Sequence, residues 1–268
     1  MMNKFKLIAF VSLVFLHHTL YAQSIPQWNP AFEQVLAKDW LIQPPQQKAG
    51  AYQSNDGKDI ILFNGLVKRS FRIAPNLACV DFRNLSSSQQ LLRAIRPEAV
   101  LTINSEQYAV GGLVGQKEKA YLLPTWIDGF KAGENDFQYT GMEVTDLQPF
   151  IHWKRKTWAY NTHQPKGKMI RFRFQSPKEQ LKGVEVDVHY ELYDGIPLIV
   201  KWVAVKNNSG KKMIINRIIN ESLGLVEEES AVVGSPDQMK KQHGLYVETN
   251  YAFNNAMRYD ISDQTTHW

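Results

Sequence analysis

A strict alternation of apolar and polar residues in the stretch VEVDVHYEL, residues 184–192, constrains the fold more than any other feature of the sequence. Successive side chains of a β-strand point to opposite faces of the sheet, so an alternation with period two predicts a half-buried antiparallel strand. The predicted apolar face consists of Val184, Val186, Val188, Tyr190 and Leu192, and the predicted polar face of Glu185, Asp187, His189 and Glu191. We expect His189 to be solvated or hydrogen-bonded on that polar face.

The residues that follow this strand predict a meander of further strands. The sequences DGIP, residues 194–197, and NNSGKK, residues 207–212, are typical of turns, because Asn and Gly tolerate positive φ. Between the turns, Lys201 interrupts one face of the next predicted strand, so that strand is expected to meet water at least in part. The other face is predicted to carry Leu198, Val200, Trp202 and Ala204, and residues 213–219 and 222–227 are expected to continue the meander.

Earlier segments add shorter strands. Residues 59–74 and 77–84 are apolar runs broken by Asn64-Gly65 and by Pro75, and residues 99–112 form a second predicted hairpin around Asn104 and Ser105. Residues 86–95, SSSQQLLRAI, are either irregular or one turn of helix. One short amphipathic helix is predicted over residues 30–40, after Asn29 as cap and with Pro30 at its first position. Its apolar face is predicted to hold Phe32, Val35, Leu36 and Trp40.

Many short strands with regular turn signals favour an all-β fold, a two-sheet antiparallel sandwich with a short N-terminal helix. No internal repeat divides the chain, so we predict an N-terminal segment at 23–49 and one sandwich domain at 50–268. The domain's only cysteine, Cys79, lies between apolar neighbours and is expected to be a small buried hydrophobe.

The first 22 residues are typical of a secretory signal peptide. Lys4 and Lys6 precede an apolar run over residues 7–16, and Ala22 offers a small residue for cleavage. The run is too short to span a bilayer, and no later stretch is long enough. We therefore expect an exported protein, periplasmic or extracellular, with no transmembrane segment in the mature chain and with cleavage after Ala22.

Three stretches carry a resemblance to a known family. Residues 190–225, YELYDGIPLIVKWVAVKNNSGKKMIINRIINESLGL, resemble the strand meander of the N-terminal β-supersandwich in secreted α-galactosidase-like enzymes of glycoside hydrolase family 36. Residues 91–116, LLRAIRPEAVLTINSEQYAVGGLVGQ, and residues 121–130, YLLPTWIDGF, are similar to upstream parts of the same domain in exported bacterial proteins. The resemblance covers about residues 50–268, and its motifs are mostly core and turn residues.

The resemblance implies a galactose-mutarotase-like supersandwich in which no bond is cleaved. In the family, catalysis uses two carboxylates on a following (β/α)₈ barrel, and this sequence shows no alternating βα pattern. We therefore expect a non-catalytic domain of an exported glycoside hydrolase, without its catalytic barrel and with that barrel as partner in cis or trans. The alternatives are a stand-alone carbohydrate-binding module, a structural or interaction domain and, as the weakest, mutarotase-like chemistry by a His and a Glu.

No catalytic residue, cofactor or metal site is predicted within this chain. The acidic groups Asp128, Glu134, Asp136 and Glu143, and the run 227–229, are expected to be solvated, and 133–137 lacks the ligand spacing of a calcium loop. Nothing in the spacing of His152, His163, His189 and His243 pairs one of them with a particular Glu.

The basic and aromatic stretch 152–174 would suit single-stranded nucleic acid in a cytosolic protein, but export argues against that partner. We expect either strands with one basic face or a surface that binds carbohydrate. The candidate carbohydrate contacts are Trp126, Trp153 and Trp158, because a flat aromatic ring can cover the C–H face of a sugar. The alternative for these three rings is burial in the core.

Overall fold

The structure is a computed structural model that describes residues 25–33, 38–118, 120–148, 164–225 and 245–247. Over these ranges the regular elements are antiparallel strands and three short 3-10 turns, joined by loops, which confirms the predicted all-β fold class. The strands are β1 (Gly50–Gln53), β2 (Asp59–Phe63), β3 (Val67–Arg72), β4 (Ala78–Asn84), β5 (Gln89–Gln90), β6 (Leu92–Ala94), β7 (Ala99–Ile103), β8 (Glu106–Val110), β9 (Gln138–Asp146), β10 (Gly167–Gln175), β11 (Val184–Tyr193), β12 (Ile199–Asn207), β13 (Ile215–Ile219) and β14 (Gly224–Leu225).

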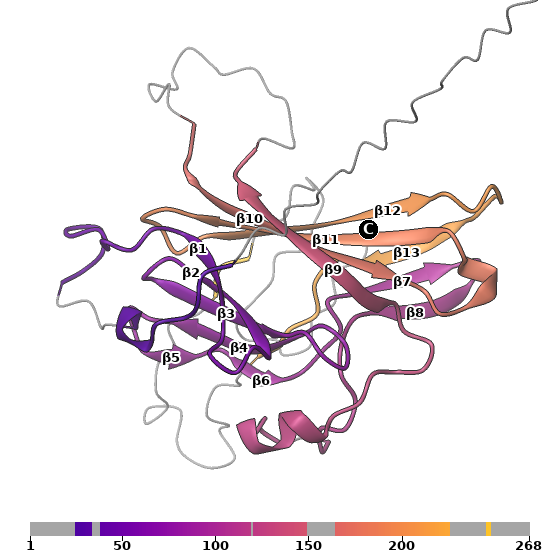
Figure 1. The fold of residues 1–268 in the computed structure, drawn as a ribbon, viewed down its shortest axis with the longest axis horizontal. Helices are drawn as coiled ribbons and strands as arrows, with labels where there is room; N and C mark the ends of the chain where they lie inside the picture. The colour runs from indigo at the N-terminus through magenta and orange to yellow at the C-terminus, as the bar shows by residue number, and fades with distance from the viewer. Residues whose placement is uncertain (1–24, 34–37, 119, 149–163, 226–244, 248–268) are drawn as a thin grey trace, which may run out of the picture.

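Two main sheets form the sandwich. The first has the order β1-β2-β3-β4-β5, and the second has the order β12-β11-β10-β9. Figure 1 shows the second sheet across the top of the molecule, with β1 to β4 below its left half and β7 and β8 below its right half. Consecutive strands pair antiparallel with each other in both sheets, so each sheet is a simple meander.

The predicted continuation of the meander beyond β12 is wrong. Strand β13 pairs with β7 in the small sheet β13-β7-β8, and β14 pairs with β6. The turn predicted at 207–212 is confirmed. After it the chain crosses to the other layer, where Ile215 lies opposite Ile103. The hairpin of β7 and β8 is confirmed, and Asn104 and Ser105 have φ of 49° and 70° at its turn.

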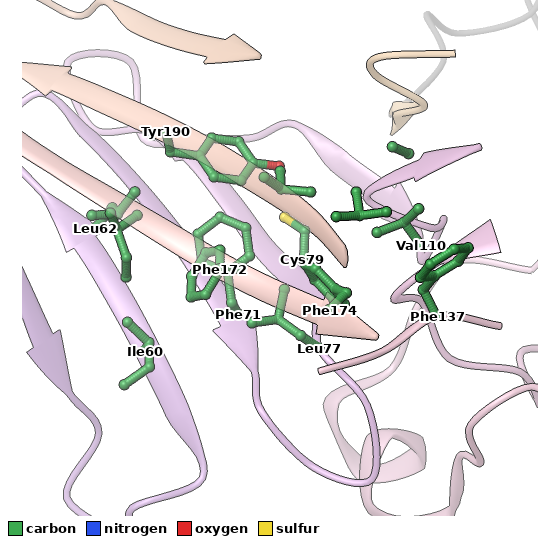
Figure 2. Close-up of a cluster of buried hydrophobic side chains, with 14 of the residues drawn as sticks. Ile60, Leu62, Phe71, Leu77, Cys79, Val110, Phe137, Phe172, Phe174 and Tyr190 are labelled. Atoms are coloured by element: carbon green, nitrogen blue, oxygen red, sulfur yellow. The ribbon is translucent and has the colours of Figure 1, made fainter. Parts of the chain in front are cut away.

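The main core lies between the layers and is built from the alternating apolar faces. The predicted apolar face of β11 is confirmed, because all five of its side chains are buried. In Figure 2 the ring of Phe71 from β3 lies beside those of Phe172 and Tyr190, from β10 and β11, with ring centroids 4.9 and 5.0 Å apart. Such aromatic contacts add to the free energy of burying the rings. The same cluster includes Ile60, Leu62, Leu77, Cys79, Val110, Phe137 and Phe174.

Of the predicted helix over residues 30–40, the structure describes 30–33 and 38–40, and among these only the first turn is helical. Asn29 caps a 3-10 turn, η1 (Pro30–Phe32), by accepting a hydrogen bond from the Ala31 amide, and Glu33 then leaves helical geometry with φ −76° and ψ 71°. Phe32 instead joins an aromatic cluster with Trp28, Tyr52 and Phe63. Packing against β2 therefore outweighs the helical periodicity, while the predicted helix-face residues at 35 and 36 lie outside the described residues.

Two other local predictions are resolved or corrected. The ambiguous stretch 86–95 forms a turn followed by strands β5 and β6, so the helical alternative is wrong.

The polar face of β11 is less exposed than predicted, because Asp187 and Glu191 are buried. Long side chains of the neighbouring strands cover Asp187, with Lys206 of β12 bound to its carboxylate and Arg171 and Arg173 of β10 close to it.

Candidate functional site

Of the three tryptophans predicted to contact carbohydrate, the structure describes Trp126. It lies on a 3-10 turn, η2 (Pro124–Gly129), and is half-buried against a second apolar cluster that includes Ile127 and Phe130. The ammonium group of Lys117 lies 5.3 Å from its ring centroid. Trp153 and Trp158 lie outside the described residues, so their distance from Trp126 is not part of the structure.

The acidic residues near η2 do not gather into one site. Asp128 forms ion pairs with Lys58 at 2.7 Å and with Arg72, and these cations lower the pKa of its carboxyl group. Glu143, on β9, pairs instead with Arg171 of β10. Burial raises the pKa of Asp136. Asp128 and Glu143 therefore serve separate local ion pairs, and the acidic run 227–229 lies outside the described residues.

A cluster of buried charges lies between the layers, and we call it the interior charge cluster. Arg69 of β3, which is 3% exposed, binds Glu221 through two hydrogen bonds, with Nη1–Oε2 3.2 Å and Nη2–Oε1 3.4 Å. Lys201 of β12, with its side chain 6% exposed, donates to the backbone carbonyl of Glu98 and to Glu221 Oε1 at 3.0 Å. Tyr190 donates its hydroxyl proton to Glu98 Oε2. The cluster therefore joins β3, β11 and β12 to the segments before β7 and after β13.

Further contacts surround the interior charge cluster, although Arg69 Nε is buried without a hydrogen-bond partner. The amide of Cys79 donates to Glu98 Oε1 at 2.8 Å, and the guanidinium of Arg69 lies 4.7 Å from the ring centroid of Tyr190. Burial alone would raise the pKa of Glu221, but the charges of Arg69 and Lys201 outweigh burial, and the pKa is lowered. Glu221 is therefore ionised near neutral pH. Two buried cations face two glutamates, which is the pairing that buried charges require.

Cys79 lies beside this cluster as a structural residue. Burial raises the pKa of its thiol to about 12, and the side chain packs in the main core (Figure 2). A thiol with such a pKa forms little of the nucleophilic thiolate at neutral pH. The predicted character of Cys79, a small buried hydrophobe, is confirmed.

A second polar constellation lies on the outer face of the sheet β9–β12, which points away from the main core. The pairing register places Arg171, His189 and Trp202 in one cross-strand row, and Arg173, Asp187 and Ala204 in the next. His189 stacks on Trp202, with ring centroids 4.6 Å apart and planes at 6°. Lys206 binds Asp187 Oδ2 at 2.6 Å. We call the set Arg171, Arg173, Asp187, His189, Trp202 and Lys206 the Asp187 patch.

Several polar atoms of the Asp187 patch have no hydrogen-bond partner. They are Asp187 Oδ1, His189 Nδ1 and Arg171 Nε, all buried. Arg173 Nε lies 3.9 Å from Asp187 Oδ1, which is too long for a direct hydrogen bond. Burial lowers the pKa of His189, so its imidazole is neutral near neutral pH. A buried polar atom without a partner is unfavourable, so these atoms indicate a place where a polar ligand or water would bind.

Both constellations were missed by the sequence interpretation, for different reasons. Lys201 was expected to expose its strand to water, but it faces the core, because Glu98 and Glu221 neutralise it there from distant segments. No local pattern reports such a pairing. One sequence signal points to the Asp187 patch, namely the alternation of Arg171 and Arg173 with Phe172 and Phe174 in the predicted basic-faced strand. The residues opposite these arginines on the neighbouring strands could not be named from the sequence.

The other predicted chemistry can be placed only in part. His189 is described, whereas His152, His163 and His243 lie outside the described residues. Among the residues that the structure describes, no group of three or more His, Cys, Asp or Glu side chains could hold a metal ion. Within the same ranges, no helix has the length and apolarity needed to cross a membrane.

Comparison of the chain with protein-family models, with curated proteins and with solved structures gave no match.

Proposed function

We propose that this chain is a non-catalytic β-supersandwich domain of an exported α-galactosidase-like glycoside hydrolase. In this proposal it packs on a (β/α)₈ barrel in cis or trans and shapes the entrance for carbohydrate. The resemblance of residues 50–268 supports the proposal, and the two-layer antiparallel fold agrees with it. The signal-peptide pattern of residues 1–22 supports export, with cleavage after Ala22, to the periplasm or the extracellular space.

The observation that carries this proposal is that the two glutamates of the interior charge cluster, Glu98 and Glu221, are bound by buried cations. A retaining glycosidase needs two carboxyl groups about 5–5.5 Å apart across the bond, one of them protonated by a raised pKa. Glu98 and Glu221 are instead held by the same two cations, Arg69 and Lys201, inside the sandwich. The pKa of Glu221 is lowered, the wrong direction for an acid catalyst. These glutamates therefore fit a structural role in holding the layers together.

A domain replacement tests the proposal. The mature chain is fused in place of the N-terminal sandwich on the barrel of an exported α-galactosidase-like enzyme, and the barrel alone and the chain alone are prepared beside it. We expect the fusion to be soluble and to hydrolyse an aryl α-galactoside, while the chain alone gives the rate of buffer. Turnover by the chain alone, or a fusion no more soluble or active than the barrel alone, contradicts the proposal.

The second candidate function is a stand-alone carbohydrate-binding module, and the surroundings of Trp126 favour it. Trp126 is half-buried, Tyr121 and Leu123 beside it are exposed, and Arg93 lies 4.8 Å from the ring centroid of Tyr121. Aromatic rings flanked by hydrogen-bond donors suit the two faces of a sugar.

Calorimetry with galacto-oligosaccharides tests this second function. Under it, the chain alone binds saturably, and Trp126→Ala weakens binding about tenfold, the loss expected for removing one aromatic contact. The matched control is Leu41→Ala, which removes an exposed apolar side chain elsewhere. Binding that is absent, or equally affected by both variants, contradicts a module centred on Trp126.

A further inference from the structure

On the outer face of the sheet β9–β12, small residues flank the charged pair Arg173 and Asp187. In the row of Arg173 and Asp187, the outer strands contribute Gly141 and Ala204, so the charged pair has small neighbours on both sides. A Cβ atom added at Gly141 would have no atom within 4 Å, so there is open space beside Arg173. The next row presents the stacked rings of His189 and Trp202. The patch thus combines a buried carboxylate, a pair of stacked rings and open space beside Arg173.

The surroundings of Asp187 use only part of its hydrogen-bonding capacity. Its side chain is 1% exposed, and its Oδ2 is bound by Lys206, while Oδ1 has no partner. The guanidinium of Arg173, with a side chain 42% exposed, has its Nε 3.9 Å from Oδ1, so donor and acceptor lie close but unjoined. Groups that can accept from Arg173 and donate to Asp187 would satisfy both residues. A hydroxyl group does both.

We propose that the Asp187 patch is a saccharide-binding site in which Asp187 Oδ1 and Arg173 hold adjacent hydroxyl groups beside the His189–Trp202 stack. The inference rests on the proposed role in carbohydrate degradation and names the surface that contacts the sugar. Asp187 accepts a hydroxyl proton, Arg173 donates to a hydroxyl oxygen, and His189 Nδ1 offers a further hydrogen bond. The aromatic edge covers C–H groups of the sugar ring.

The charges of the patch favour a neutral polyhydroxyl ligand over an ion. An anion would meet the buried carboxylate of Asp187, which has unused acceptor capacity, and a metal cation would meet Arg171, Arg173 and Lys206. Glu143 already pairs with Arg171, and Lys206 with Asp187. The unpartnered Asp187 Oδ1 lies beside the partly exposed guanidinium of Arg173, an arrangement of acceptor and donor that matches the neighbouring hydroxyl groups of a sugar.

Nuclear magnetic resonance titration of the mature chain tests the site. The probes are methyl α-D-galactopyranoside, methyl β-D-galactopyranoside and methyl α-D-glucopyranoside, and the readouts are the amide resonances of β10–β12 and the Arg173 Nε–H and His189 ring resonances. We expect saturable shifts in this set with at least one probe. We expect Arg173→Met to weaken that affinity about tenfold, as for loss of a charge-assisted hydrogen bond.

The matched control is Arg83→Met on β4. Arg83 is 44% exposed at its side chain and pairs with Asp81 at 2.9 Å, so it resembles Arg173 in exposure and charge but lies on the other sheet. The control is expected to keep wild-type affinity, and equal loss in both variants overturns the site. Shifts confined to the surroundings of Trp126 also overturn it, while leaving the second candidate function in place. Absence of saturable shifts with all three probes overturns it as well and assigns the unpartnered atoms to water, whereas the domain-replacement result stands independently.

Discussion

Arg69 and Glu221 form a bidentate ion pair inside the sandwich, although they lie 152 positions apart in the sequence. Arg69 comes from the first sheet, and Glu221 comes from the segment between β13 and β14. Because Lys201 of the second sheet binds the same carboxylate, one side chain joins both layers to the chain that leaves β13. Such a buried network is stabilising only while every charge keeps its partner.

The first prediction is that Glu221→Gln destabilises the fold. The substitution leaves Arg69 and Lys201 with Glu98 as their remaining carboxylate in the cluster, so one buried positive charge is uncompensated. Removing one partner of a fully buried pair costs about 3–5 kcal/mol, and the 30% exposure of Glu221 reduces the expected loss to about 2–3 kcal/mol. Urea unfolding of the purified chain measures it.

Glu179→Gln is the matched control for this measurement. Glu179 is 85% exposed at its side chain and pairs with Lys182 at 3.5 Å, so the same chemical change removes only a surface ion pair. We expect a change within about 0.5 kcal/mol. If the two variants unfold at the same urea concentration, the interior charge cluster is not a source of stability.

The second prediction is that the stability difference between wild type and Glu221→Gln depends on pH. The folded-state pKa of Glu221 lies below its usual value of 4.5, so its carboxylate stabilises the fold fully above that value. This contribution is lost as the pH falls through the lowered folded-state pKa. The difference should therefore be constant from about pH 7 to pH 5 and shrink toward about pH 2, in urea unfolding at each pH. A difference that is unchanged at the acid end would contradict the assignment.

The fold could be predicted largely because its information is local. Alternation over 184–192 specifies which side chains of β11 are buried, and the Asn104-Ser105 turn specifies a hairpin. Local sequence does not specify which strands pair. The turn after β12 would equally allow β13 to pair with β12 in the same sheet. Its pairing with β7 depends on packing between segments more than 100 residues apart.

The polar sites could not be predicted for the same physical reason. A lysine in a strand is expected in water, and Lys201 faces the core only because distant glutamates neutralise it. Asp187 is likewise buried by Arg171 and Arg173 of one neighbouring strand and Lys206 of the other. Alternation indicates the face of a side chain, but not what the rest of the chain places over that face.

The third prediction concerns Asn64, which joins the two main sheets. Its amide nitrogen donates to the carbonyls of Tyr193 and Ile196 at 2.7 and 2.8 Å, and its oxygen accepts from the amides of Leu66 and Val67. We expect Asn64→Ala to lower the free energy of unfolding by about 3 kcal/mol, because it leaves buried backbone groups without partners.

An exposed asparagine in a comparable turn serves as control. Asn208→Ala, in the turn after β12, is expected to change stability by less than about 0.5 kcal/mol. Asn64→Asp keeps the acceptor but places a carboxylate oxygen against two carbonyls, so it should be no more stable than Asn64→Ala at neutral pH. Equal stability of Asn64→Ala and wild type in urea unfolding would show that the asparagine does not tie the sheets together.

The fourth prediction is that Cys79 reacts with thiol reagents only after unfolding. At about pH 8, a thiol pKa of about 12 in place of 9.0 lowers the thiolate fraction about a thousandfold, and burial in the core blocks access as well. A coloured aromatic disulfide reagent should therefore label the native chain at least a thousandfold more slowly than the chain in urea. Labelling that requires unfolding cannot be faster than unfolding itself, so the unfolding rate is the upper limit of the native reaction. Because the sequence contains one cysteine, the unfolded chain is its own reference and Cys79→Ala gives the background. Rapid labelling of the native chain would mean that the core between β4 and β11 opens to solvent, and it would contradict the packing around Phe71, Tyr190 and the interior charge cluster.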